Sequence, residues 1–137
     1  MQQSKKVKIR WADKLLVKVN KSIIIDGMAR GGPYSHAVVA GETMYISGQT
    51  GLDGNNQHDF RSQFIGAINN IDRIAKSAEM SIKNIVKIVV YISDKKYFRD
   101  LNEVFGEYFE QNPPARTTIV SGFVDDKILV EIDAILH

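Results

Sequence analysis

Apolar residues recur along the middle of the chain with the spacing of an amphipathic helix. They stand at i, i+4, i+7, i+8, i+11, i+15 and i+18, namely Phe60, Phe64, Ala67, Ile68, Ile71, Ala75 and Ala78. This spacing places all of them on one face of a helix. Asp59 stands directly before the first of them, where a helix N-cap is expected. The pattern predicts a helix that starts after Asp59 and packs one face on a core.

A second stretch with helical spacing follows Asp94, which can cap it. Its apolar stripe consists of Phe98, Leu101, Phe105, Tyr108 and Phe109. Pro113 and Pro114 end this helix, because proline has no backbone N–H and disfavours helical geometry in the residue before it. We expect the phenylalanines of both helices to lie in the core.

The segments around the helices have strand character. Residues 85–92 (IVKIVVYI) are nearly all apolar and β-branched, which is typical of a buried central strand. Further strands are predicted over residues 35–40, 43–47, 116–120 and 128–136. The order is therefore β-β-α-β-α-β-β. Two helices on one face of a mixed sheet is the simplest packing, which predicts a two-layer α+β domain.

The last predicted strand has two different faces. One face is apolar and can pack under the helices; it consists of Ile128, Val130, Ile132, Ala134 and Leu136. The other carries Leu129, Glu131, Asp133 and Ile135. Two acids between apolar side chains suit neither a bare solvent face nor a dry core. We expect this face to meet another subunit or a wet cleft.

An arginine and a glutamate can be close together in this sheet. Arg116, Thr118 and Val120 share a face of the strand that precedes the last one. If the two strands adjoin, Arg116 and Glu131 form either a solvated cross-strand ion pair or a functional pair. An arginine binds a carboxylate at two points, and a glutamate can hold or deprotonate water. The pair suits a small carboxylate attacked by water, and equally a passive carboxylate-binding site.

The charge distribution divides the chain. The net charge is +2, but residues 1–21 carry seven basic side chains and one acid, whereas the remainder carries 11 basic and 15 acidic side chains. We therefore assign residues 1–31 to a basic N-terminal extension, partly ordered at most, and residues 32–137 to one domain. The domain has no basic face to continue the extension, so we interpret the extension as a solvated arm and expect no nucleic-acid partner.

Several classes of site are excluded by composition. The chain has no cysteine, which excludes disulfides, thiolate zinc sites and iron–sulfur clusters. His36, His58 and His137 are too scattered to predict a metal site. No apolar run approaches the roughly 18 residues of a membrane span, so neither a membrane partner nor a location outside the cytoplasm is expected.

Five short motifs occur in an order that resembles the RidA/YjgF family. They are GPYSHA from Gly32, ISGQ from Ile46, LNEV from Leu101, PART from Pro114 and VEIDA from Val130. The resemblance runs from about Gly32 to Leu136, most of the chain. It implies a chorismate-mutase-like fold and homotrimers whose sheets form a central barrel, with a site in each cleft between subunits.

The resemblance also implies an activity. Archetypal members are deaminases that hydrolyse enamine and imine compounds, notably 2-aminoacrylate, to 2-oxo acids and ammonia without a cofactor. Arg116 matches the arginine that clamps the substrate carboxylate, and Glu131 matches the acid that positions the attacking water. The remaining matches near the site are Tyr34 and Ser47, which correspond to pocket residues, and Asn102.

The chain departs from the family pattern at two places. Thr118 replaces a common cysteine whose backbone carbonyl contacts the substrate, so we expect Thr118 to bind substrate in the same way and activity to survive. His36 replaces a common glutamine, and we interpret it as a surface strand residue. Two other functions stay open: a non-enzymatic regulatory module that binds small carboxylates, and an RNA-binding or endoribonuclease activity that only the basic arm supports.

Overall fold

The structure is a computed structural model that describes residues 20–137. Residues 1–19, which carry most of the basic side chains of the predicted extension, lie outside the described residues. The elements in chain order are β1 (Asn20–Ile23), β2 (Ala37–Ala40), β3 (Thr43–Thr50), α2 (Phe60–Lys76), β4 (Ile85–Ile92), α3 (Phe98–Tyr108), β5 (Ala115–Val120) and β6 (Val130–Leu136). Short 3-10 turns over Ile82–Asn84 and Lys95–Tyr97 precede β4 and α3.

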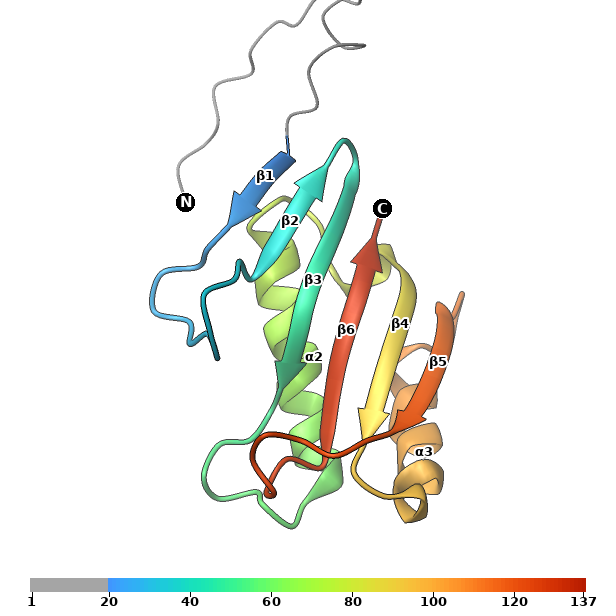
Figure 1. The fold of residues 1–137 in the computed structure, drawn as a ribbon. Coiled ribbons are helices and arrows are strands. Elements are labelled where there is room, and N and C mark those ends of the chain that lie inside the picture. Colours follow the sequence, from blue (N-terminus) through green and yellow to red (C-terminus); the bar gives the residue numbers. More distant parts are fainter. Residues whose placement is uncertain (1–19) are drawn as a thin grey trace, which may run out of the picture.

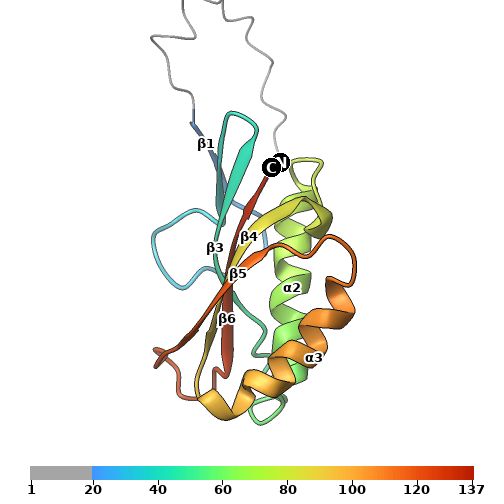
Figure 2. The same ribbon diagram turned by 90° about the vertical axis from the view of Figure 1, so that its right-hand side faces the viewer.

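From β2 onward the element order is the predicted β-β-α-β-α-β-β. Strand β1, which pairs antiparallel with β2, lies inside the segment assigned to the extension, and the sequence pattern did not predict it. The described strands form one sheet in the order β1-β2-β3-β6-β4-β5. Both helices lie on one face of this sheet (Figures 1 and 2), which confirms the two-layer α+β fold.

Strands β5 and β6 are not neighbours, which corrects the expectation that Arg116 and Glu131 lie on adjoining strands. β4 lies between them and pairs parallel with β5 and antiparallel with β6. A parallel pair needs a crossover connection, and α3 supplies it. β6, with its apolar helix-side face, takes the central position, whereas the more polar β5 is left at the edge, where unpaired backbone groups are tolerated.

The first helix forms as the pattern predicts. The Asp59 carboxylate accepts a hydrogen bond from Ser62 N at 3.0 Å and caps α2. The buried face of α2 includes every predicted position up to Ala75. Ala78 lies beyond the end of the helix and is partly buried against the core.

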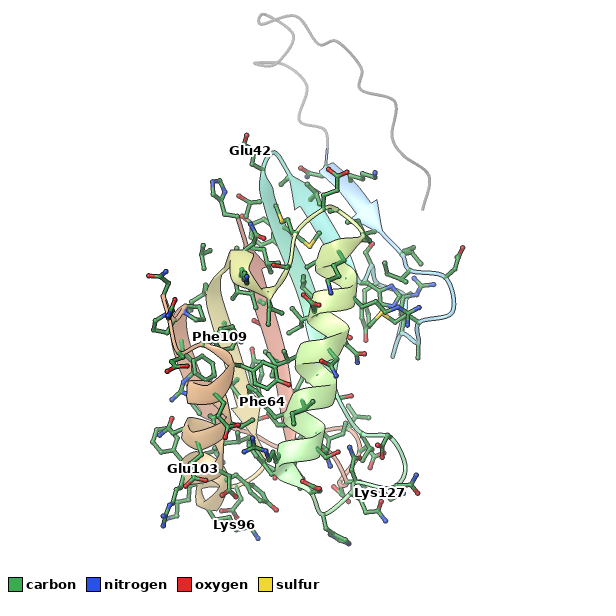
Figure 3. The ribbon with its side chains drawn as sticks, turned by 180° about the vertical axis from the view of Figure 1, so that it is seen from behind. Glu42, Phe64, Lys96, Glu103, Phe109 and Lys127 are labelled. Carbon is green, nitrogen blue, oxygen red and sulfur yellow. The ribbon has the colours of Figure 1, made fainter. Side chains whose placement is uncertain are left out.

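The second helix starts with a different geometry from the predicted one. Asp94 caps the 3-10 turn Lys95–Tyr97, and α3 follows. Phe98 therefore stands at the first position of α3 and is 46% exposed, so its assignment to the core was wrong. Phe105 and Phe109 are buried, and Phe105 packs edge-on against Phe64 of α2. Figure 3 shows Phe64 between the two helices.

A buried glutamine joins three segments. The Gln63 amide donates to Asn56 O and Lys127 O at 2.9 and 3.0 Å, and its carbonyl accepts from Leu129 N at 2.8 Å. These bonds fasten the loop before α2 and the chain leading into β6 to the helix. Because every polar atom of Gln63 has a partner, its burial does not carry the penalty of an unpaired amide.

Two glycines let the end of β3 approach α2 closely. A Cβ added to Gly51 would lie 2.0 Å from Gln63 O and 2.7 Å from Ala67 N, and one added to Gly66 would lie 2.8 Å from Gly51 Cα. Backbone atoms cannot retreat from such a contact without moving the helix. This approach brings α2 against the part of β3 that continues beyond β2.

We expect Gly51→Ala to lower the free energy of unfolding by at least about 2 kcal/mol, because the added methyl forces β3 and α2 apart. Gly106→Ala is the matched control, since a Cβ at Gly106 meets nothing within 4 Å and alanine favours helix α3, which raises stability by about 0.5–1 kcal/mol. Urea denaturation at one protein concentration measures both. Equal midpoints for Gly51→Ala and the wild type would contradict the close approach.

Candidate functional site

The two faces of β6 separate as the sequence predicts. Val130, Ile132, Ala134 and Leu136 are buried beneath the helices, whereas Glu131, Asp133 and Ile135 face away from them and are half-buried. The alternation starts at Val130 and not at Ile128. Leu129, predicted on the acidic face, is therefore buried, because it precedes the strand and is held by Gln63.

Glu131 packs against a glycine that the sequence analysis did not single out. A Cβ at Gly48 would lie 2.6 Å from Glu131 Oε2, so any other residue at this position would displace the carboxylate from where it lies. The register of β3 against β6 shifts between Ile46 and Gln49, which is the irregularity that a glycine inside a strand pattern indicates. Burial, together with the charge of Asp133, raises the pKa of the Glu131 carboxyl.

Glu131 and Gly48 line a cavity of about 800 Å³ at the point where β3 runs past the end of β2 (Figure 1). Tyr34, which is 45% exposed, contributes from the loop before β2. Its hydroxyl accepts a hydrogen bond from Gly31 N at 3.0 Å, and its carbonyl accepts one from Arg30 Nη1 at 3.0 Å. The loop is thus closed on itself around the tyrosine.

The hydroxyl of Ser47 is already engaged. Ser47 Oγ donates to Ser35 O at 2.7 Å, and Ser47 N donates to His36 O at 3.0 Å. Ser47 therefore stands next to Gly48 and holds the end of the Tyr34 loop against β3. In this position it shapes the wall of the cavity through the loop it binds.

His36 is buried, with 1% of its surface exposed, so its interpretation as a surface residue was wrong. Ile25 N donates to its Nδ1 at 3.0 Å, which leaves the ring proton on Nε2, 3.2 Å from Ala29 O. β2 begins only at Ala37, so strand alternation does not apply to His36. The imidazole fastens the segment between Ile25 and Ala29, part of which lines the cavity.

Arg116 lies on the other face of the sheet. It is in register with the buried Ile88 of β4, and its guanidinium carbon stands 4.7 Å from the centre of the Phe105 ring and 5.8 Å from that of Phe98. Nη2 donates to Asn102 Oδ1 of α3 at 2.8 Å. Burial lowers the pKa of Arg116, but an arginine stays protonated at neutral pH.

The charge of Arg116 is not paired with an acid among residues 20–137. None of the ion pairs within residues 20–137 involves it, and its hydrogen bond goes to a neutral amide. The two aromatic rings and Asn102 hold the guanidinium in place and leave further N–H groups available. Such an arrangement can bind an external carboxylate at two points.

Thr118 follows two residues later on the same face of β5. Its Oγ1 is buried and, within the described part of the chain, has no hydrogen-bond partner. A buried hydroxyl in this state is not exposed to solvent. Binding of a substrate by the backbone carbonyl of Thr118 stays a prediction.

The candidate residues thus form two groups on opposite faces of the sheet. The arginine half-site consists of Asn102, Arg116 and Thr118, beside α3. The glutamate half-site consists of Tyr34, Ser47, Gly48 and Glu131, around the 800 Å³ cavity. Within residues 20–137, no three histidine or acidic side chains gather closely enough to hold a metal ion. Over the same residues, no helix is long and apolar enough to cross a membrane.

The chain matches the family model described as Endoribonuclease L-PSP over residues 25–137. A RutC family protein from Sulfurisphaera tokodaii is 35% identical over 76% of this chain and 86% of its own length. The human 2-iminobutanoate/2-iminopropanoate deaminase is 33% identical over 76% of this chain and 79% of its own.

A solved structure of RidA from the Antarctic bacterium Psychrobacter sp. PAMC 21119 superposes with a TM-score of 0.76 at 35% identity. The match covers 85% of this chain and 98% of that one. The fold, the family model and these relatives agree with the motifs around Tyr34, Ser47, Arg116 and Glu131. The chain belongs to the RidA/YjgF family, whose family model is Endoribonuclease L-PSP.

Proposed function

We propose that the protein is an enamine/imine deaminase that hydrolyses 2-aminoacrylate-type compounds and small 2-imino acids to 2-oxo acids and ammonia. The observation that carries this proposal is Arg116, a half-buried guanidinium that is held by Asn102 and two rings and has no acidic partner in the described part of the chain. The names of the mammalian relatives as 2-iminobutanoate/2-iminopropanoate deaminases support the same reaction.

The site is completed by a second copy of the chain. In one protomer, Arg116 lies beside α3 and Glu131 lies on the opposite face of the sheet, with β4 between their strands. A small substrate touches both only if they come from different copies. We propose a homotrimer with the substrate in each cleft between subunits.

The uncovered face of the sheet suits such an assembly. Tyr45 of β3 and Ile119 of β5 are 49% and 41% exposed, and by their register they share this face with Ile135 and Tyr91. Exposed apolar side chains gathered on one face mark an interaction surface. Burial of this face in a central barrel of sheets removes these side chains from water.

The reaction follows from the two half-sites. Arg116 of one copy holds the substrate carboxylate, and Glu131 of the other holds a water molecule beside the imine carbon. The water oxygen bonds to that carbon, the C=N electron pair moves to the protonated nitrogen, and Glu131 takes the proton of the water. Glu131 then gives this proton to the nitrogen. As the C–N bond breaks, the hydroxyl oxygen forms the C=O bond and releases its remaining proton to Glu131, so that ammonia and a 2-oxo acid leave and Glu131 passes that proton to solvent. An enamine first tautomerises to the imine.

The raised pKa of Glu131 suits this role. A group that exchanges protons works best when its pKa lies near the operating pH, and burial moves the carboxyl in that direction. No bound cofactor takes part in this scheme, because the imine carbon is already electrophilic once its nitrogen is protonated. The protein has to orient the substrate, hold the water and accept and release its protons.

We expect the wild type to accelerate pyruvate release when a serine dehydratase generates 2-aminoacrylate, and Arg116→Gln to lose about a hundredfold or more of this rate, since each charged hydrogen bond contributes about 1.5–3 kcal/mol. Arg99→Gln is the control, because Arg99 is an exposed arginine of α3 paired with Glu103. Absence of acceleration by the wild type would overturn the proposal, and tight binding of 2-oxobutyrate without turnover would indicate a binding module instead.

We expect Glu131→Gln to lower the turnover rate by about 10²–10⁴-fold and yet to raise stability at pH 7. A carboxyl whose pKa is higher in the folded than in the unfolded state stabilises the fold when protonated, and this contribution is lost as the pH rises through the folded value. The stability advantage of the glutamine variant should therefore disappear below the ordinary value of 4.5.

Thermal unfolding between pH 4 and pH 8 measures this difference, within roughly the range where the carboxyl changes its charge. Glu42→Gln, at the exposed β2–β3 turn (Figure 3), is the control for the loss of one negative charge. A glutamine variant that is less stable than the wild type at pH 7 would show that ionised Glu131 has a stabilising partner.

We expect Asn102→Asp to weaken binding of 2-oxobutyrate about tenfold or more, because the new carboxylate pairs with Arg116 and competes with the ligand carboxylate. Asn102→Ala should weaken it less, since it only frees the guanidinium to move. Calorimetric titration of the three proteins gives this ranking. Equal affinities for the two variants would contradict a charge-based clamp at Arg116.

A further inference from the structure

We infer that the substrates of this protein include 2-imino acids whose side chain ends in a second acidic group, which Arg73 and Arg30 bind. This inference rests on the proposed function and specifies its substrate class. It starts from the cavity at the glutamate half-site, which is lined not only by Tyr34, Gly48 and Glu131 but also by these two arginines.

Arg73 is the one arginine within residues 20–137 without a polar partner. The others bind a protein oxygen; they are Arg30 with Tyr34 O, Arg61 with Glu107, Arg99 with Glu103 and Arg116 with Asn102. Arg73 stands in the last turn of α2, is exposed, and makes no hydrogen bond or ion pair with the described residues. Its guanidinium is therefore free to bind an anion that enters the cavity.

Arg30 reaches the same cavity from the loop before β2. Only its Nη1 is engaged, at Tyr34 O, and the remaining guanidinium N–H groups are available. The loop that carries Arg30 is fixed on both sides, by His36 through Ala29 and by Tyr34 through Gly31. This anchoring fixes the backbone on both sides of Arg30, so less backbone freedom is lost when an anion binds.

The acids of the lining leave these arginines unneutralised. They are Asp125 and Glu131. Asp125 accepts a hydrogen bond from Lys127 N at 2.9 Å and so caps its own turn. Glu131 packs at Gly48, on the side of the sheet away from the helices, whereas Arg73 belongs to a helix on the other side. Neither acid forms an ion pair with Arg30 or Arg73.

The cavity is also larger than the simplest substrate requires. Its volume of about 800 Å³ lies in the range of pockets that hold molecules much larger than 2-aminoacrylate, which has about six non-hydrogen atoms. The cavity extends from Glu131, round the free edge of β3, to Asn70 and Arg73 on α2. A substrate side chain that extends from the imine carbon away from Glu131 therefore points along the cavity toward the two arginines.

The three guanidinium groups then bind different ends of the substrate. Arg116 of one copy holds the carboxylate next to the imine carbon, and Arg73 and Arg30 of the other copy hold the terminal acid. Glu131 acts on the carbon in between by the hydrolysis described above. The reaction that supplies such a substrate is the two-electron oxidation of an amino acid with an acidic side chain, which leaves a C=N bond at the α-carbon.

A matched pair of substrates tests this inference. An amino-acid oxidase generates the imines of glutamate and of glutamine, which have nearly the same shape and differ in the terminal charge. The measured quantity is the rate of 2-oxo acid release above the uncatalysed rate, expressed as kcat/KM. We expect the wild type to prefer the glutamate imine by about tenfold, equivalent to one additional charged contact.

Arg73→Gln and Arg30→Gln should each reduce this preference several-fold, and the double variant should abolish it. Lys76→Gln is the control, because Lys76 carries the same charge one turn further along α2, pairs with Asp72 at 2.7 Å and does not line the cavity. Its preference should equal that of the wild type. Added salt should reduce the preference of the wild type, since exposed charges are screened.

Calorimetry with 2-oxoglutarate and 2-oxobutyrate separates this inference from the proposed function. Hydrolysis of both imines without preference, or a preference that Arg73→Gln leaves intact, overturns the inference and leaves the deaminase proposal standing. No hydrolysis, but tighter binding of 2-oxoglutarate that Arg73→Gln weakens, supports the recognition of the second acid and overturns the deaminase. If the protein shows no hydrolysis and no preference for 2-oxoglutarate in binding, both the inference and the deaminase proposal are overturned.

Discussion

The position of β6 between β3 and β4 is the constraint on which the rest of the structure depends. It brings Glu131 next to Gly48, where the register of β3 against β6 shifts, and it buries the apolar face of β6 under both helices. It also leaves β5 at the edge of the sheet, where Arg116 can lie over the rings of α3 without being enclosed. The strand order therefore positions both half-sites and places them on opposite faces of the sheet.

Much of the fold could be predicted from local patterns. Helical spacing and the capping residue Asp59 located α2, and the alternation along β6 assigned its two faces. Strand order could not be predicted in this way, because it depends on which edges pair across the whole domain. The misplaced residues Phe98 and His36 stand just at or before the start of an element, where periodicity no longer determines burial.

The candidate site was predictable in its residues but not in its geometry. The motifs pointed to Arg116, Glu131, Tyr34, Ser47 and Asn102, and the hydrogen bond between Asn102 and Arg116 brings two of them together. Gly48, Arg30 and Arg73 carry no chemical signal of their own in the sequence. They matter only because the folded chain brings a loop, a strand and a helix around one cavity.

Because the two half-sites lie apart in one chain, two inactive variants of the protein can complement each other. In the proposed trimer, a chain that lacks a working arginine half-site still carries an intact glutamate half-site, and the reverse holds for its counterpart. In a mixed trimer of the two variants, some clefts pair the intact arginine half-site of one chain with the intact glutamate half-site of its neighbour. These clefts have the wild-type residues, so activity would reappear on mixing. Each catalytic unit is then a junction between neighbours, and a lone protomer holds only unmatched halves of it.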